Sequence, residues 1–465
     1  MSLVQGYSSS EEGEEEEEEE KNVKEVEVKR LGDEVDQPHK RQKTQSSTFQ
    51  AIPYDAAKFE ANIQQAKLKE AKARAKELKQ RRKKNGGDPW APIHSEQTQV
   101  YQPSEPAQIV NEEDSDEKEA EFNDKFKPTS EFVGSSEFDY QGRSYMHIPN
   151  SLVKKVPGDQ ECFVPKSVIH TFSKAHPKGV NKLQFFPQSG HLLLSCGNDG
   201  LIKLWSVYDS FELLRNYKGH KLAVKDVCFN STGSHFLSCG YDKLVRLWNT
   251  ETGEVIKTIE TSSVPNVVRF NPNNESEFII GLQNHKIEHF SLTAIHNPIQ
   301  VYDHHIGAIN DILATPETFI STSDDKSIRV WKWQINIPIK VISDPSQFST
   351  PSIKKHPTAN YIALQSMDNC VKVIHSTGKY KWNKNKVFKG HQSAGYGIEV
   401  GFSPDGKIVM SGDSQGYAVF WDWQSKKIVN KWKLSTAPIK CIVFHPLETS
   451  KVAVAGTSGD IYYCD

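Results

Sequence analysis

The chain has 465 residues and a formal net charge of −2. We expect neither a membrane protein nor a secreted one, because no apolar run approaches the roughly 18 residues that span a bilayer, and the N-terminus opens on acidic residues rather than on a basic patch with an apolar core. Seven cysteines with no CxxC pair favour reduced, buried thiols in an intracellular protein.

Residues 1–54 have the composition of a disordered tail with acidic and basic blocks. Positions 11–20 hold nine glutamates around Gly13, and like charges at that density repel one another and stay solvated. A Lys-Arg-Gln-Lys cluster at 40–43 can be interpreted as a nuclear import signal, although isolated clusters of this kind are common. Such a segment cannot bury enough apolar surface to fold alone.

Residues 55–86 are predicted to form a basic helix. Ala, Lys, Glu, Gln and Leu dominate up to Lys84 without Pro or Gly, and Gly86 and Gly87 end the pattern. Two interpretations stay open: a solvated, charge-rich helix, or an arm that docks on phosphates or on an acidic protein through counterion release. The candidate contact residues are Lys72, Arg74, Lys76, Arg81, Arg82, Lys83 and Lys84.

Residues 87–165 are expected to form an extended docking arm. Order should return at 137–149, where aromatic residues and a glycine are closely spaced in an otherwise polar segment. This segment predicts either a docking peptide or a strand or turn that lies against the side of the following domain. The candidate docking residues are Trp90, Tyr140, Gly142, Arg143 and Tyr145.

From about residue 169 to the end, one pattern recurs about every 42 residues. Short runs of alternating apolar and polar residues, bounded by turn-forming residues, predict strands. The closing positions of the seven copies, separated by 43, 42, 41, 43, 47 and 43 residues, are Trp205, Trp248, Phe290, Trp331, Ile374, Trp421 and Cys464. Such a period, with a glycine–histidine pair and a closing tryptophan, resembles the WD40 propeller blade.

The predicted fold is therefore all-β: a seven-bladed WD40 β-propeller over 166–465, preceded by a long, largely extended or disordered N-terminal arm with one basic helix. A propeller must close its ring, and the last copy ends at Cys464 and Asp465 without an outer strand. We expect residues 166–172 to supply that strand, which would leave no unpaired sheet edge.

The WD40 resemblance implies a hydrogen-bonded set of His, Ser or Thr, Asp and Trp in each complete blade, which would satisfy the buried indole and imidazole groups. Copies three, five and seven lack most of the set and should be the locally weakest, and in copy six Gln415 replaces the Asp. The expected sets are His176, Ser195, Asp199 and Trp205; His220, Ser238, Asp242 and Trp248; His305, Ser321, Asp325 and Trp331; and the partial set His391, Ser411 and Trp421.

A more specific resemblance lies both upstream of the repeats and within them. The stretches that carry it are 87–91, 139–145, 147–149 and 162–166, and within the repeats 189–196, 321–327, 365–369, 388–391 and 394–396. They are similar to the family of pre-mRNA-processing factor seventeen. The resemblance covers the chain from about Phe138 onward and is loose upstream, where the arm is shorter than in animal members, as in a fungal-type member.

The resemblance implies a nuclear, non-catalytic scaffold of the spliceosome that supports the second transesterification, exon ligation. The implied partners are spliceosomal proteins of the catalytic core and, through the basic arm, the backbone of small nuclear RNA or pre-mRNA. A membrane and a small-molecule substrate are not expected. The alternative is a generic WD40 adaptor in another nuclear complex, such as a ubiquitin ligase or a chromatin reader, because fold alone does not set function.

A Ser-His-Asp hydrolase is the third class to weigh. The same three residue types recur beside a tryptophan in three copies, which indicates structural bonding rather than a nucleophilic triad. The sequence also contains no phosphate loop or zinc-ligand spacing. We therefore expect no catalytic residue, no metal site and no cofactor.

Overall fold

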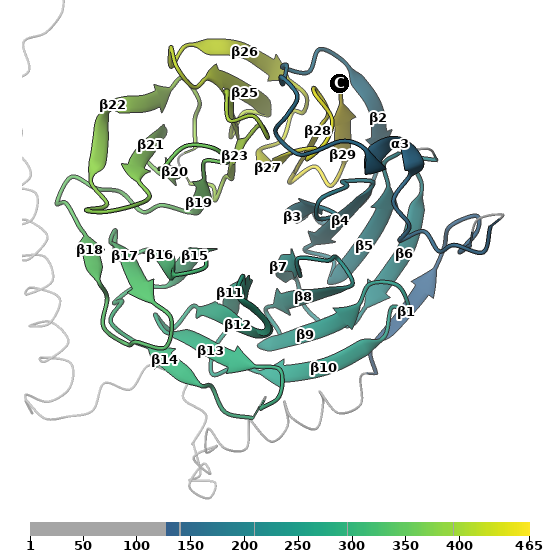
Figure 1. Ribbon diagram of the computed structural model, residues 1–465, viewed down its shortest axis with the longest axis horizontal. Helices are drawn as coiled ribbons and strands as arrows, with labels where there is room; N and C mark the ends of the chain where they lie inside the picture. Colours follow the sequence, from purple (N-terminus) through teal and green to yellow (C-terminus); the bar gives the residue numbers. More distant parts are fainter. Residues whose placement is uncertain (1–126, 139–140, 209, 295, 394) are drawn as a thin grey trace, which may run out of the picture. The chain divides into compact units, whose positions relative to one another are not determined.

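The computed structural model describes residues 127–138, 141–208, 210–294, 296–393 and 395–465. These residues form seven antiparallel sheets arranged as blades around a central axis, which confirms the predicted seven-bladed β-propeller (Figure 1). The expected tail, the expected helix over 55–86 with its basic contact residues, and the candidate docking residues Trp90 and Tyr140 lie outside the described residues.

In blades 1 to 6 the strands follow the chain from the centre of the ring outward. Blade 1 contains β3 (Val180–Phe185), β4 (Leu192–Gly197), β5 (Leu201–Ser206) and β6 (Leu213–Lys218). Blade 2 contains β7 (Val224–Phe229), β8 (His235–Gly240), β9 (Leu244–Asn249) and β10 (Val255–Glu260). Blade 3 contains β11 (Pro265–Asn271), β12 (Asn274–Leu282), β13 (Ile287–Ser291) and β14 (Gln300–Tyr302). Blade 4 contains β15 (Ile309–Ala314), β16 (Thr318–Ser323), β17 (Ile328–Lys332) and β18 (Lys340–Ile342).

Blade 5 contains β19 (Ser352–Lys355), β20 (Tyr361–Ser366), β21 (Cys370–His375) and β22 (Trp382–Lys389). Blade 6 contains β23 (Val400–Phe402), β24 (Ile408–Gly412), β25 (Tyr417–Asp422) and β26 (Ile428–Lys433). Blade 7 contains β27 (Ile439–Phe444), β28 (Val452–Gly456) and β29 (Ile461–Cys464) and, as its outer strand, β2 (Val168–Phe172).

The position of a strand within its blade decides its pattern of burial. Every residue of β4 is buried, because a second strand is covered on both faces by the neighbouring blades. In the outer strand β26 the residues are exposed or half-buried. Hydrophobic clusters fill the spaces between blades, so each blade is stabilised mainly by its two neighbours.

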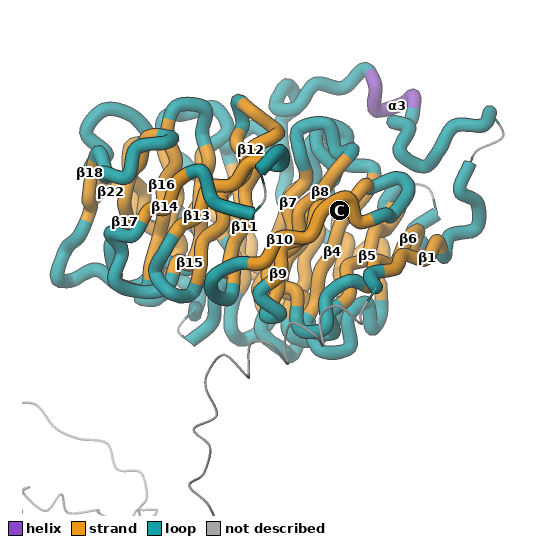
Figure 2. Tube along the Cα trace, turned by 90° about the horizontal axis from the view of Figure 1, so that it is seen from below, coloured by secondary structure: helices purple, strands orange, loops and turns teal. Residues whose placement is uncertain are grey.

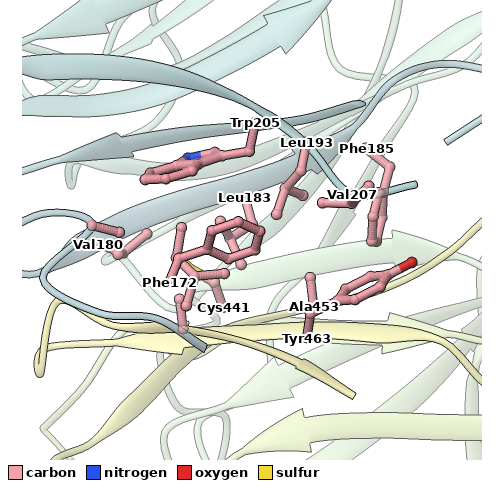
Figure 3. Close-up of a cluster of buried hydrophobic side chains, with 13 residues drawn as sticks. Phe172, Val180, Leu183, Phe185, Leu193, Trp205, Val207, Cys441, Ala453 and Tyr463 are labelled. Carbon is pink, nitrogen blue, oxygen red and sulfur yellow. The ribbon is translucent and has the colours of Figure 1, made fainter. Parts of the chain in front are cut away.

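The predicted ring closure is confirmed. β2 pairs antiparallel with β29, and the sheet order is β2-β29-β28-β27. The backbone N–H groups of Lys166 and Ser167 both donate to the Asp465 carbonyl, at 2.8 and 2.7 Å. Phe172 at the end of β2 enters the cluster between blades 7 and 1, among Trp205, Leu183 and Cys441 (Figure 3).

The segment before the ring adds two elements to the outside of the propeller. β1 (Thr129–Phe132) pairs antiparallel with β6 and becomes a fifth strand of blade 1. The single helical turn α3 (Asn150–Val153) lies beyond the strand ends on one face of the disc (Figure 2) and buries Leu152.

Among the described residues, no helix is long and apolar enough to cross a membrane. In the same part of the chain, no group of three or more His, Cys, Asp or Glu side chains is arranged to hold a metal ion. The seven cysteines are free thiols, and six of them are buried.

Candidate functional site

Blade 2 contains the expected set of four side chains in one hydrogen-bonded chain. His220 Nδ1 lies 3.0 Å from both carboxylate oxygens of Asp242, and His220 Nε2 lies 2.7 Å from Ser238 Oγ. The indole N–H of Trp248 donates to Ser238 Oγ at 2.9 Å. With His Nδ1–H donating to the Asp and the Ser hydroxyl donating to Nε2, every polar group has a partner.

Blades 1 and 4 repeat this geometry. His176 and His305 contact Ser195 and Ser321 at 2.8 and 2.7 Å, and Trp205 and Trp331 donate to the same serines at 2.8 Å. Their aspartates, Asp199 and Asp325, contact Nδ1 at 3.0 and 2.8 Å. Burial lowers the pKa of His176 and of His305, which keeps both rings neutral near pH 7.

The carboxylates of these sets remain ionised. Burial opposes ionisation, but hydrogen bonds from the histidines hold the pKa of Asp199 and of Asp242 below the usual value. In blade 2 the glycine before the histidine has a packing reason: a Cβ on Gly219 would lie 2.5 Å from Trp248 Cζ2. A larger residue there would displace the indole from its serine.

Blade 6 differs from the prediction. His391, Ser411 and Trp421 are buried, but they are not bonded to one another: the Trp421 N–H donates to the Lys389 carbonyl at 2.9 Å. The Gln365 amide from blade 5 contacts His391 Nε2 at 2.7 Å and accepts from Ser411 Oγ at 3.2 Å. The expected three-residue bonding was therefore wrong for this blade.

The physical reason is a longer side chain in the neighbouring blade. Gln365 occupies the strand position that Cys196 and Cys239 occupy in blades 1 and 2, opposite the first residues of the third strand. A glutamine reaches across the interface where a cysteine cannot. Gln415, expected in place of the aspartate, bonds instead to Gln392 at 3.0 Å.

In the three degenerate blades, apolar side chains replace the tetrad tryptophan. Phe290 and Ile374 are buried in clusters of aliphatic or aromatic side chains. Cys464 is buried as well, in the strand β29 that pairs with β28. Asn284 donates to Ser262 Oγ at 3.3 Å, and Ser458 Oγ accepts from the Asp460 N–H at 3.4 Å. Packing therefore takes the place of the polar chain in these blades.

The tetrads also define one face of the disc. Each tetrad histidine lies in the loop that enters a blade, and its aspartate lies in the turn between the second and third strands, so their bond holds both loops on the same face. We call this the tetrad face. In blade 4 the Ile306 N–H also donates to Asp325 Oδ2 at 3.1 Å, so the tetrad fixes the backbone of the loop.

The tetrad face displays large apolar side chains that the sequence analysis did not single out. The exposed fraction of these side chains is highest for Ile306, at 84%, and lowest for Tyr396, at 38%. Leu222, Phe348 and Tyr241 have exposed fractions between these two values. Lysines flank the rings: Lys225 Nζ lies 4.3 Å from the Tyr241 ring centre and Lys326 Nζ lies 5.9 Å from that of Phe348. Exposed apolar groups on rigid loops suit protein docking.

One signal in the sequence could have found part of this set. Leu222, Tyr241 and Ile306 each lie within two positions of a tetrad histidine or aspartate. A large apolar residue at such a position points away from the bonded network, because the network already occupies the interior.

The candidate docking residue Tyr145 lies on the propeller itself, as in the second of the two interpretations. Its hydroxyl donates toward the Thr250 and Glu251 carbonyls, each at 2.8 Å, and accepts from Arg215 Nε at 3.1 Å. The Arg215 guanidinium lies 5.9 Å from the Tyr145 ring and 5.5 Å from the Phe132 ring. Tyr145 therefore fastens the arm to blades 1 and 2.

The other two described docking candidates lie close by. Arg143 Nη1 contacts His147 Nε2 at 2.9 Å. Gly142 has φ of +73°, a left-handed conformation that favours glycine, and a Cβ added there would meet no other atom within 4 Å. Both belong to the turn that leads from β1 back toward blade 1.

After this turn the arm crosses the face opposite the tetrads. Lys155 forms an ion pair with Glu448 at 2.9 Å, the Cys162 N–H donates to Asp405 at 2.9 Å, and the Phe163 N–H donates to the Thr449 carbonyl at 2.7 Å. A cavity of about 710 Å³, lined largely by apolar residues with two lysines, lies between this segment and blades 5 to 7. The arm thus occupies much of this face over blades 7 and 6.

The inner strands contain a charged network that the sequence analysis missed. Arg269 forms ion pairs with Asp226 and, at 2.8 Å, with Asp311. Lys182 pairs with Glu399 and lies 3.7 Å from Asp226. Burial acts against these charges, but the neighbouring carboxylates of Asp226 and Asp311 raise the pKa of Arg269. The network joins the inner strands of blades 1, 2, 3 and 4 to Glu399, the residue just before the inner strand of blade 6.

These features place the chain in a class: it is a WD40-repeat β-propeller. The family model described as WD domain, G-beta repeat, matches residues 166–206, 211–249, 296–332 and 382–422. The matched segments contain the closing tryptophans of blades 1, 2, 4 and 6, whereas the closing positions of the three degenerate blades lie outside them.

Within that class, the chain belongs to the pre-mRNA-processing factor 17 family. It is 37% identical to Pre-mRNA-processing factor 17 of Saccharomyces cerevisiae across 100% of both chains. It is 38% identical to the Homo sapiens protein of the same name, over 81% of this chain and 66% of the human one. WD repeat-containing protein 25 of Mus musculus is more distant, at 24% identity over 65% of this chain. The family resemblance seen in the residues is confirmed.

The difference between blades 2 and 6 leads to a prediction. We expect Ser238→Ala to cost about 1–3 kcal/mol of unfolding free energy, because the Trp248 N–H loses its buried acceptor. In a double-mutant cycle with Trp248→Phe, the coupling energy should be about 1 kcal/mol or more. The matched cycle of Ser411→Ala with Trp421→Phe should show coupling near zero, since those side chains share no hydrogen bond. Equal couplings in urea titrations would contradict the blade 6 geometry.

Proposed function

We propose that this chain is a non-catalytic scaffold of the spliceosome that acts in the nucleus and supports exon ligation, the second chemical step of pre-mRNA splicing. The observation that carries the proposal is the 37% identity with a protein named Pre-mRNA-processing factor 17, which extends over 100% of both chains. The similarity extends beyond the propeller to the arm, which generic WD40 adaptors need not share.

The geometry supports a scaffold rather than a hydrolase. In each complete set the serine oxygen is buried and bonded to both a histidine and a tryptophan, so no substrate carbonyl can approach it. A rigid disc instead offers two faces and a rim, and here the arm crosses one face over blades 6 and 7. The tetrad face is left to bind other proteins.

The proposed partners are proteins of the spliceosomal catalytic core, docked on the tetrad face through Ile306, Leu222 and Tyr241. The basic segment over 55–86 is proposed to contact the backbone of small nuclear RNA or pre-mRNA. Neither contact requires a cofactor, a membrane or a small-molecule substrate.

The test is depletion of the protein from a splicing extract of the same organism, followed by addition of purified full-length chain. We expect depletion to accumulate lariat intermediate and free first exon, and the added chain to restore ligated exons. Normal ligation after depletion would overturn the proposal and favour an adaptor in another nuclear complex.

A face-specific variant sharpens this experiment. Ile306→Asp with Tyr241→Asp places charge on the tetrad face without touching a tetrad hydrogen bond, and it should fail to restore ligation. The matched control Ile337→Asp with Ile339→Asp changes two exposed aliphatic residues at the outer edge of blade 4 and should restore it. Equal rescue by both variants would remove the tetrad face from the proposal.

A further inference from the structure

The outer rim of blades 5 and 6 is rich in lysine. β22 and β26 are the outermost strands of these neighbouring blades (Figure 1). Between and beside them lies what we call the lysine seam, formed by Lys384, Lys386 and Lys389 from blade 5 and by Lys426, Lys431 and Lys433 from blade 6. Five of these six side chains are exposed, and Lys386 is half-buried.

Hydrogen bonds across the blade boundary hold the seam together. Lys426 Nζ donates to the Asn385 carbonyl at 3.1 Å, and Lys431 Nζ donates to the Gly390 carbonyl at 3.0 Å. Both carbonyls belong to blade 5 or the loop that follows it, while both lysines belong to blade 6. The two rows of ammonium groups are therefore fixed beside each other.

Aromatic rings lie beneath several of the ammonium groups. Lys386 Nζ lies 3.9 Å from the ring centre of Trp423, and Lys431 and Lys433 lie 4.8 and 5.5 Å from that of Tyr417. Cation–π contacts of this kind orient the lysines. Trp423 is buried and Tyr417 half-buried, so these rings support the charges and are not available to stack with a ligand.

Few acidic groups compensate the seam. Asp413 lies 3.3 Å from Lys431 and is fully buried, and the half-buried Asp422 accepts the Ser425 N–H at 2.6 Å. Burial and the nearby charge of Lys426 lower the pKa of Lys386. The exposed Asp344 also interacts with the charge of Lys384. Six lysines against these three carboxylates leave a positive surface on this part of the rim.

We propose that the lysine seam binds the phosphodiester backbone of RNA. Phosphates are the ligands that rows of exposed lysines neutralise with release of counterions. Lysine side chains cover the nearest rings, Trp423 and Tyr417, so the contact reads the backbone rather than the sequence. This inference goes beyond the proposed function and is measured on the purified protein, so the splicing experiment can fail or succeed independently.

An acidic protein segment is the competing occupant, and the composition disfavours it. Protein interfaces are enriched in arginine and aromatic residues and depleted of lysine. No arginine follows Arg329 in the chain, so the seam has no bidentate carboxylate ligand of the kind that protein interfaces use. The exposed aliphatic pair Ile428 and Val429 lies only where β26 begins.

The test measures affinity of the full chain for fluorescent single-stranded RNAs of unrelated sequence by anisotropy, over a range of salt concentrations. The seam variant changes Lys384, Lys389, Lys426 and Lys433 to Gln and keeps Lys386 and Lys431, which have the closest internal contacts. We expect Kd to rise about tenfold or more, equally for all sequences, and the salt slope to fall in magnitude by about 0.7 per lost phosphate contact.

The matched control removes the same charge from exposed lysines elsewhere on the propeller: Lys174, Lys178, Lys332 and Lys340, all changed to Gln. It should bind RNA nearly as well as the unchanged chain. A second seam variant, with Arg at the four seam positions, keeps the charge and should retain affinity, which separates loss of charge from loss of folding.

Three results would overturn the proposal: equal weakening by the seam and control variants, an unchanged salt slope, or loss of affinity in the Arg variant as large as in the Gln variant. A fourth is a seam variant that loses affinity for poly-glutamate while its affinity for RNA is unchanged. That outcome would assign the seam to an acidic protein.

Discussion

Replacing Phe172 by Ala should lower the free energy of unfolding of the propeller by about 3–5 kcal/mol, the usual cost of removing a buried phenylalanine. Phe172 is 4% exposed and its ring lies 4.7 Å from that of Trp205. It is the residue of β2 that packs into the space between blades 7 and 1 (Figure 3). Urea unfolding followed by tryptophan fluorescence measures the loss.

Deleting residues 166–172 should destabilise the ring further. The deletion removes the whole β2–β29 ladder as well as Phe172, and it leaves the N–H and C=O groups of β29 unpaired at an open edge. We therefore expect a lower melting temperature than for Phe172→Ala and a greater tendency to aggregate.

Phe163→Ala is the matched control, because the Phe163 ring is 57% exposed and lies just before β2 in the chain. Its unfolding free energy should stay within about 0.5 kcal/mol of the unchanged protein. If Phe172→Ala and the deletion were as mild as this control, the first and last segments of the propeller would not close the ring.

The sequence predicted the ring because its determinants recur within each repeat. A buried tryptophan and a buried histidine need partners, and in blades 1, 2 and 4 those partners come from the same repeat. Spacing along the chain is then enough to predict the bonding. Ring closure followed from the same logic, since a final copy one strand short requires a strand from elsewhere.

Contacts between blades were much harder to predict. Gln365 rearranges the bonding of His391 and Ser411, yet it belongs to a different repeat from both. Whether a side chain reaches across an interface depends on the packing of two sheets, which no single repeat encodes. The prediction for blade 6 was wrong for this reason.

The arm shows the same limit. The aromatic spacing around Tyr145 suggested docking, but only the structure shows that the ring lies against Arg215 of blade 1 and carbonyls of blade 2. The strand β1 has four residues, TSEF, too short and too polar to predict alone. Its partner β6 lies more than eighty residues away in the sequence.

The charged network of the inner strands could have been found by aligning the repeats. Asp226 and Asp311 occupy equivalent positions at the irregular pairing of the first two strands, and each accepts an N–H from the next blade, at 3.1 Å from Val268 and from Ile353. The identity of their cationic partner could not be read in this way, because Arg269 lies between them on the strand of a third blade.

Arg269→Met should cost about 3–5 kcal/mol of unfolding free energy at neutral pH, because it leaves two buried carboxylates without their main cation. Arg269 contacts both Asp226 and Asp311, which are 3% and 5% exposed. Lys182 lies 3.7 Å from Asp226 but already pairs with Glu399. The double variant Arg269→Met with Asp226→Asn should recover part of the loss, since one of the two uncompensated charges is gone.

The stability difference between the unchanged protein and the Arg269→Met variant should depend on pH. Burial opposes ionisation of Asp226, but Arg269 and Lys182 hold its pKa below the usual value, so in the unchanged protein this carboxylate contributes stability that is lost as pH falls. Without Arg269, burial prevails and the pKa of Asp226 rises, so the variant gains stability as this carboxylate binds a proton. The difference between the two proteins should therefore shrink from pH 7 toward about pH 5. A difference that widens on acidification, or a loss below about 1 kcal/mol at neutral pH, would show that Arg269 is not the cation on which these carboxylates depend.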